Sequence, residues 1–78
     1  MDLESIRQDL VSGLGESQVD MQADGSKLVL ALVSEKFEGL NKVKRQQLVY
    51  SLLNDRISSG EIHAVTMTTL TSDESIGS

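Results

Sequence analysis

The segment KLVLALVS, Lys27–Ser34, decides the fold, because it is apolar on both of its alternating sides from Leu28 to Val33. Such a run is typical of a strand that lies in the middle of a sheet, with neighbours on both sides. Asp24 and Gly25 come shortly before it and form a strong signal for a two-residue hairpin turn, in which both central positions need positive φ. We therefore expect this segment to be the central strand of a small sheet.

The stretch SQVDMQA, residues 17–23, supplies the other half of the hairpin. Its apolar and polar residues alternate, which predicts a strand with one wet face at an edge of the sheet. Before it, the stretch DLESIRQDLVSGLG has apolar residues at spacings of three and four. This pattern predicts a helix that begins at the N-cap Asp2 and ends at Gly13 or Gly15.

After the central strand, Asn41 is a candidate N-cap for a second helix, KVKRQQLVYSLLNDRI, residues 42–57. Its predicted apolar stripe consists of Val43, Leu48, Val49, Leu52, Leu53 and Ile57. Ser58, Ser59 and Gly60 end the helix, and EIHAVTMTTLT, residues 61–71, is rich in β-branched residues. This last stretch predicts a third strand.

The predicted order is helix, strand, strand, helix, strand. A hairpin followed by a right-handed strand-helix-strand crossover returns the third strand parallel to the second and puts both helices on one face. We therefore expect an α+β fold with a three-stranded mixed sheet in the order 1-2-3. Residues 1–78 would form one domain, with 72–78 as a loose polar tail. The open sheet face would suit contact with a partner.

Composition narrows the function. The chain has 78 residues, no cysteine and a formal net charge of -5, so it offers no disulfide, no thiolate nucleophile and no cysteine-based metal site of its own. The negative charge opposes nonspecific binding to phosphate backbones. No run of about 20 apolar residues suits a bilayer and no basic N-terminal leader is present, so we expect a protein of the cytoplasm without membrane contact.

The chain shows no arrangement that is typical of an enzyme. No pair of carboxylates stands beside a candidate nucleophile, and no glycine-rich phosphate loop precedes a helix. The only histidine, His63, has no cysteine or second histidine with which to form a chelate. We therefore expect binding rather than catalysis.

His63 opens the predicted third strand, on the same side as Val65 and Met67. This spacing puts the imidazole at the rim of an apolar face, beside the turn at Gly60. Two interpretations are open from the residues alone. The ring is either half-buried and hydrogen-bonded to the backbone, or exposed as a metal ligand or a pH-sensitive contact.

Lys42, Lys44 and Arg45 are three of the seven basic residues and lie together at the start of the second helix. The helix dipole makes cations unfavourable at that end, so the cluster indicates an external anion or an acidic partner; the other interpretation is a solvated surface. Phe37 and Tyr50 are the only aromatic residues. We expect both in the core or at its rim rather than stacked on bases.

The stretch VSEKFEGLNKVKRQQLVYSLLNDRISSGEIHAVTMTTLT, residues 33–71, closely resembles the BolA family. The resemblance extends over nearly the whole chain when the first helix and the hairpin are included. The matching motifs are Phe37-x-Gly39, Val43-x-Arg45, the pair Val49-Tyr50, the string Ile62-His63-Ala64 and the threonine-rich last strand.

This resemblance implies a fold similar to the type II KH domain and a partnership with a monothiol glutaredoxin. In that heterodimer a two-iron two-sulfur (2Fe-2S) cluster is shared: the glutaredoxin supplies cysteine and glutathione sulfur, and the Ile-His-Ala motif supplies histidine, here His63. Imidazole in place of thiolate tunes the potential of such clusters. We therefore expect a non-enzymatic adaptor in cluster trafficking or iron sensing, with Lys42, Lys44 and Arg45 steering or clamping the partner or its glutathione.

The chain departs from the family pattern in two places. Many members carry a second histidine or cysteine in or after the hairpin loop, where this chain has ADGSKL, with Lys27 at about that place. Asp24 and Ser26 offer only oxygen, which suits a soft iron-sulfur centre poorly, and Lys27 joins the candidate residues for contact with a partner or an anion. The tail also lacks the proline and tryptophan that are common in the family.

A second hypothesis is a KH-like nucleic-acid-binding regulator of transcription. The basic cluster favours it, whereas the net charge of -5 and the lack of a Gly-x-x-Gly loop oppose it. The open sheet face also leaves room for a homodimer.

Overall fold

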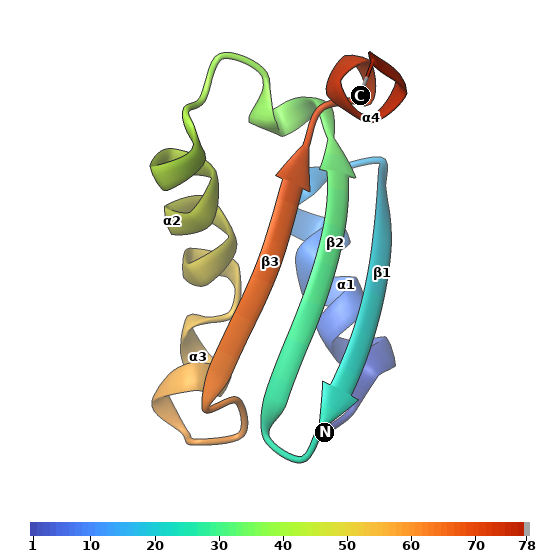
Figure 1. The fold of residues 1–78 in the computed structure, drawn as a ribbon. Coiled ribbons are helices and arrows are strands. Elements are labelled where there is room, and N and C mark those ends of the chain that lie inside the picture. The colour runs from blue at the N-terminus through green and yellow to red at the C-terminus, as the bar shows by residue number, and fades with distance from the viewer. Residues whose placement is uncertain (78) are drawn as a thin grey trace.

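A computed structural model describes residues 1–77 of the chain. Three strands form one sheet, helices pack on it, and a short helix closes the described chain (Figure 1). The elements are α1 (Leu3–Leu14), β1 (Ser17–Asp24), β2 (Lys27–Ser34), the 3-10 helix η1 (Glu35–Phe37), α2 (Lys42–Leu52), α3 (Asn54–Ser58), β3 (Ala64–Leu70) and α4 (Ser72–Gly77). Within residues 1–77, no helix is long and apolar enough to cross a membrane.

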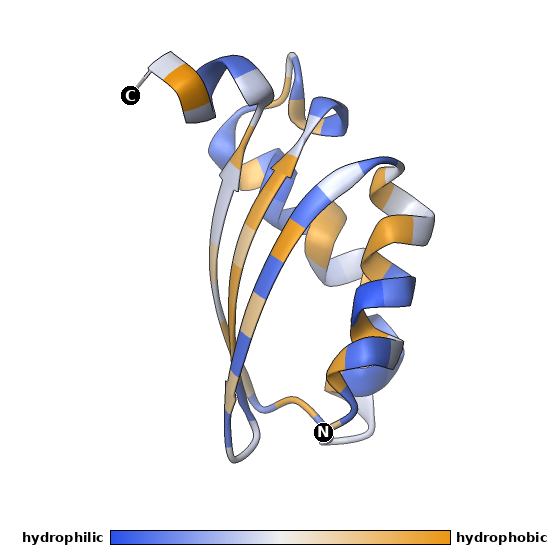
Figure 2. Ribbon diagram, turned by 90° about the vertical axis from the view of Figure 1, so that its right-hand side faces the viewer, coloured by the Kyte–Doolittle hydropathy of each residue, from blue (hydrophilic) through white to orange (hydrophobic). Residues whose placement is uncertain are grey.

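The sheet confirms the predicted topology. Its order is β1-β2-β3, with β1 antiparallel and β3 parallel to the central strand. Figure 2 shows α1 and α2 on one face of the sheet, whereas the other face is bare. The α+β architecture predicted from periodicity is therefore the observed one.

The core lies between the sheet and the helices. In β2 the leucines Leu28, Leu30 and Leu32 point into it, while Val29 on the opposite side is 45% exposed. The central position of this strand was predicted correctly, and its second apolar side faces outward. The remaining buried apolar residues are Ile6, Leu10, Leu14, Val19, Phe37, Val49, Leu53 and Ile62.

Helix α1 begins as predicted, because the Asp2 carboxylate accepts a hydrogen bond from the Ser5 amide at 3.2 Å. It ends at Gly15, whose φ is 72°, and not at Gly13. Gly13 lies within the helix where α2 approaches: a Cβ there would overlap the side chain of Leu52. This glycine therefore permits close packing of two helices.

Three predicted boundaries were wrong. The helix predicted over residues 42–57 is interrupted at Leu53, which separates α2 from α3. In addition, Val43 of its predicted apolar stripe is 60% exposed. The third strand begins at Ala64, so His63 precedes it. The hairpin pairs Asp24 with Lys27, so the turn residues are Gly25 and Ser26, and of the two only Gly25 has positive φ.

The predicted loose tail is wrong for residues 72–77, which form α4. Thr71 and Glu74 cap this helix reciprocally: the Glu74 amide donates to the Thr71 hydroxyl at 3.2 Å, and the Thr71 amide donates to the Glu74 carboxylate at 2.9 Å. Such a capping box satisfies two amides at a helix start. Ser78, the last residue of the predicted tail, lies outside the described residues.

Candidate functional site

His63 lies beside the hairpin turn. Its amide donates to the Ser26 carbonyl at 2.8 Å, and the next residue, Ala64, pairs with Lys27 as β3 joins the sheet. Figure 1 shows the turn and the start of β3 together at the lower end of the sheet. The only histidine and the hairpin loop therefore belong to one site, although about forty residues of chain lie between them.

The imidazole of His63 is exposed, and no group within residues 1–77 forms a hydrogen bond or an ion pair with it. The ring lies over Gly60, because a Cβ built on that glycine would be 3.5 Å from Nε2. The first interpretation of His63, a half-buried ring bonded to the backbone, is thus excluded. Both ring nitrogens remain available to an external group.

An open pocket adjoins the imidazole, between the helices and the start of β3. It has a volume of about 290 Å³ and is lined by Tyr50, Ile57, Ile62, His63, Ala64 and Val65. Tyr50 is 42% exposed, so it lies at the rim, while Phe37 is fully buried. The expectation of a core position is therefore confirmed for Phe37, whereas Tyr50 is an exposed side chain beside the pocket. The pocket and the exposed imidazole thus form one continuous surface at this end of the sheet.

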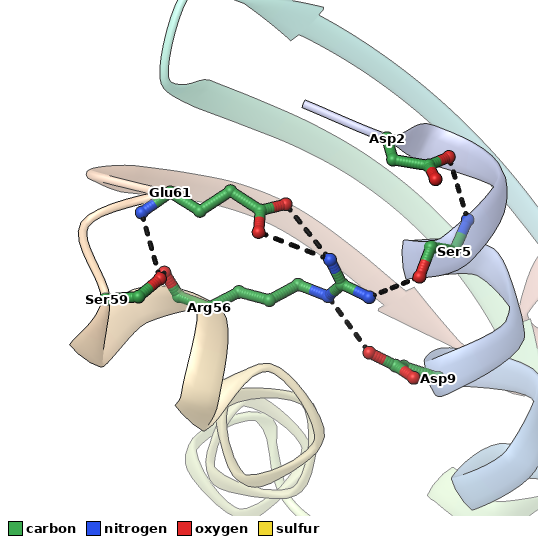
Figure 3. Close-up of polar contacts among 6 residues, drawn as sticks. All are labelled: Asp2, Ser5, Asp9, Arg56, Ser59 and Glu61. Carbon is green, nitrogen blue, oxygen red and sulfur yellow. Dashed lines mark hydrogen bonds and ion pairs between the residues drawn. The ribbon is translucent and has the colours of Figure 1, made fainter.

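Arg56 holds the loop that carries His63, as Figure 3 shows. Its guanidinium donates to Glu61 in that loop at 3.0 Å, and to Asp9 and Ser5 of α1 at 3.0 and 2.6 Å. The Arg56 side chain is only 18% exposed. The hydrogen bond to Asp9 is the main cause of the raised pKa of Arg56, followed by the one to Glu61.

The sequence did not reveal this network. Periodicity describes which face of a helix is apolar, but it carries no signal for a pairing between residues 47 positions apart, such as Arg56 and Asp9. The interruption at Leu53 was also unexpected, and Arg56 belongs to the short helix that follows it.

The basic cluster lies far from His63. The Arg45 guanidinium donates to the Thr69 carbonyl at 3.1 Å, near the end of β3, and the stretch from His63 to Thr69 spans roughly 20 Å of extended chain. Lys42 and Lys44 are exposed at this same upper end of the sheet (Figure 1). The structure therefore does not bring Lys42, Lys44 and Arg45 into one site with His63, whereas Lys27 lies beside it at the hairpin.

Arg45 is bound within the chain. Besides the Thr69 carbonyl, it donates to the Leu40 carbonyl at 2.8 Å and forms a two-pronged ion pair with Glu74 of α4, at 2.6 and 3.1 Å. Its guanidinium also lies 5.9 Å from the centre of the Phe37 ring. The hydrogen bond from Arg45 is the main cause that lowers the pKa of Glu74 to about 2. These contacts argue against Arg45 as a binder of an external anion.

The residues near His63 do not form a metal site on their own. Within residues 1–77 there is no group of three or more histidine, cysteine, aspartate or glutamate side chains that could hold a metal ion. Asp24 and Ser26, the predicted weak oxygen ligands, and Lys27 lie in or beside the hairpin turn. A metal ion bound at His63 would therefore need ligands from outside residues 1–77.

Comparison with known proteins gives a consistent result. Residues 10–74 match the family described as BolA, BolA-like protein. The chain is 35% identical over 74 residues to the Acid stress protein IbaG of Escherichia coli, covering 95% of this chain and 88% of that protein.

Solved structures show the same fold. A bolA protein homologue from Coxiella burnetii has a TM-score of 0.82 with 32% identity, covering 97% of both chains. The BolA domain of SufE1 from Arabidopsis thaliana has a TM-score of 0.75 with 34% identity, covering 91% of this chain and 92% of that one. Sequence and structure agree, and the chain belongs to the BolA family.

Proposed function

We propose that this protein is a non-enzymatic adaptor that binds a monothiol glutaredoxin and donates His63 to a 2Fe-2S cluster shared between the two proteins. The observation that carries the proposal is the exposed imidazole, which has no hydrogen-bond partner within residues 1–77 and adjoins an open pocket. Family membership supplies the class of partner, because partnership with a monothiol glutaredoxin is what the BolA resemblance implies.

The donor set of this chain fits the role of a single ligand. An imidazole nitrogen is a known ligand of two-iron two-sulfur clusters in place of thiolate, and it raises their potential. The oxygens of Asp24 and Ser26 match such a centre poorly. In this proposal the partner's cysteine and glutathione provide the sulfur ligands, and His63 completes the coordination from this side.

The docking surface follows from the position of His63. It comprises the hairpin turn, the loop before β3 and the pocket with Tyr50 at its rim. Lys27, at the hairpin, is the predicted cation that lies within this surface. Lys42 and Lys44 lie at the opposite end of the sheet and, in this proposal, do not clamp the partner or its glutathione.

A titration tests the proposal. Isotope-labelled protein is mixed with a cluster-loaded monothiol glutaredoxin, while NMR follows the backbone amides and visible circular dichroism follows the cluster. We expect shifts centred on His63 and residues 24–27, an altered cluster spectrum, and no change at Lys42 and Lys44. Shifts without a spectral change would mean docking without ligation, and no response at all would contradict the proposal.

The nucleic-acid hypothesis remains as a second candidate because Lys42 and Lys44 are exposed and free of ion pairs within residues 1–77. Arg45 no longer counts as a candidate phosphate contact in this hypothesis, because its guanidinium is already bound to Glu74. Binding to nucleic acid that weakens steeply with salt and disappears in a Lys42→Ser, Lys44→Ser double variant would support it. Binding that is absent or insensitive to salt would oppose it.

A further inference from the structure

We propose that Arg56 is a positioning residue for His63: it fixes the loop of residues 59–62 and thereby sets where the imidazole meets the hairpin and the partner. The role for the partner rests on the proposed function, whereas the positioning itself concerns the free protein. The inference comes from the contacts of Arg56, which none of the sequence motifs includes.

The imidazole ring of His63 is not held in place by a hydrogen bond to any group within residues 1–77. The position of the imidazole therefore depends mainly on the course of its backbone. The backbone is held on one side by the bond from the His63 amide to the Ser26 carbonyl. The other side is the loop that follows α3.

Arg56 holds this loop from both its backbone and its side chain. The Arg56 carbonyl accepts from the Ile62 amide at 3.1 Å and from the Ser59 hydroxyl at 3.0 Å. The guanidinium meets both carboxylate oxygens of Glu61, at 3.3 and 3.0 Å. Both bonds come from the single nitrogen Nη1, so they tie the Glu61 carboxylate to one corner of the guanidinium.

Arg56 is itself fixed. Asp9 and Ser5 of α1 accept from its Nε and a terminal nitrogen, so the guanidinium is held between α1 and the loop (Figure 3). Ile62, next to His63, is 1% exposed and belongs to the core. The loop therefore lies between a buried apolar anchor and a guanidinium tied to a helix.

Two variants separate positioning from general stability. Glu61→Ala removes the contact between Arg56 and the loop, whereas Asp9→Ala removes a contact between Arg56 and α1 and leaves the loop contact in place. Each of these two variants lacks one of the carboxylates that form an ion pair with the Arg56 guanidinium. A third variant, Arg56→Lys, keeps the positive charge but loses the planar guanidinium that reaches Glu61, Asp9 and Ser5 together.

The measurement is amide hydrogen exchange of the free protein by NMR, at His63 and at Leu30 in the centre of β2, which reports global unfolding. We expect Glu61→Ala and Arg56→Lys to accelerate exchange at His63 by about tenfold relative to Leu30, as the loss of a charged hydrogen bond predicts. Asp9→Ala should change the amide exchange rate less at His63 than at Leu30. Unchanged exchange at His63 in Glu61→Ala, or equal acceleration at both amides in all three variants, would overturn the inference.

A second readout concerns the complex. If His63 ligates the shared cluster, Glu61→Ala should alter the visible circular dichroism of the complex in the same bands as His63→Ala, and less strongly. A complex in which His63→Ala has no effect would refute the proposed function and leave the exchange result on Arg56 standing. A complex that responds to His63→Ala but not to Glu61→Ala would count against the positioning role.

Discussion

Replacing Gly60 by alanine tests the turn that presents His63. Gly60 has a φ of 85°, in the left-handed region that L side chains adopt only at a cost. An added Cβ would lie 3.5 Å from Nε2 of His63, which is ordinary van der Waals contact. The effect of the substitution should therefore come from the backbone alone and not from a clash.

The magnitude follows from two opposing contributions. A left-handed conformation costs an alanine roughly 1–2 kcal/mol. The alanine also restricts the unfolded chain, which returns about 0.4–1 kcal/mol to the folded state. The midpoints of these two ranges leave a net loss, so we expect Gly60→Ala to lower the free energy of unfolding by about 0.8 kcal/mol. Gly60→Asn should cost less despite its larger side chain, because asparagine tolerates this conformation better.

Urea unfolding followed by far-ultraviolet circular dichroism measures both variants. With a slope of about 1 kcal/mol per molar urea, the lower end for small proteins, the midpoint of Gly60→Ala should fall by roughly 0.8 M with an unchanged slope. If Gly60→Ala matches the unaltered protein, or if Gly60→Asn is the less stable of the two variants, then the turn does not depend on a left-handed residue and the reasoning fails.

Three further predictions concern packing and pH. Gly13→Ala should destabilise the protein by up to about 2 kcal/mol in thermal unfolding, because overpacking against α2 costs about 1–3 kcal/mol and the higher helix propensity of alanine returns about 1 kcal/mol. A gain in stability would exclude the close approach of α1 and α2. Leu30→Ala should cost about 2–5 kcal/mol and Val29→Ala less than about 1 in the same assay, because only the former lies in the core; equal losses would mean that the outer sheet face is covered. The pKa of Glu74 is lowered from 4.5 to about 2, so its stabilising effect is complete above pH 4.5 and is lost as the pH falls towards 2. The melting temperature of Glu74→Gln should therefore fall less over this range than that of the unaltered protein, and parallel curves would contradict the ion pair with Arg45.

Most of the fold was predictable because its signals are local. The Asp2 cap, the Asn41 cap, the alternation in β1 and the apolar run of β2 each lie within a few residues, and each is observed. The strand order then follows from the handedness of the crossover. Helix α4 had a local signal as well, since Thr71 and Glu74 have the spacing of a capping box, but the run after it is short and polar.

The site was less predictable because it depends on contacts between distant segments. The partners of Arg56 and the turn register at Gly25 are set by tertiary packing rather than by periodicity. The separation of Lys44 from His63 could have been deduced from the topology. The crossover helix starts near the end of the second strand, whereas the parallel third strand starts at the opposite end of the sheet. The exposure of the imidazole required the structure.

The central claim is that His63 is the ligand this chain gives to a shared cluster. Visible circular dichroism of the complex with a cluster-loaded monothiol glutaredoxin tests it most directly, with His63→Ala compared with Lys44→Ala, a variant at the opposite end of the sheet. The account predicts that His63→Ala changes or abolishes the cluster bands, that Lys44→Ala preserves them, and that both variants stay folded. Identical cluster spectra for His63→Ala and the unaltered protein would contradict it.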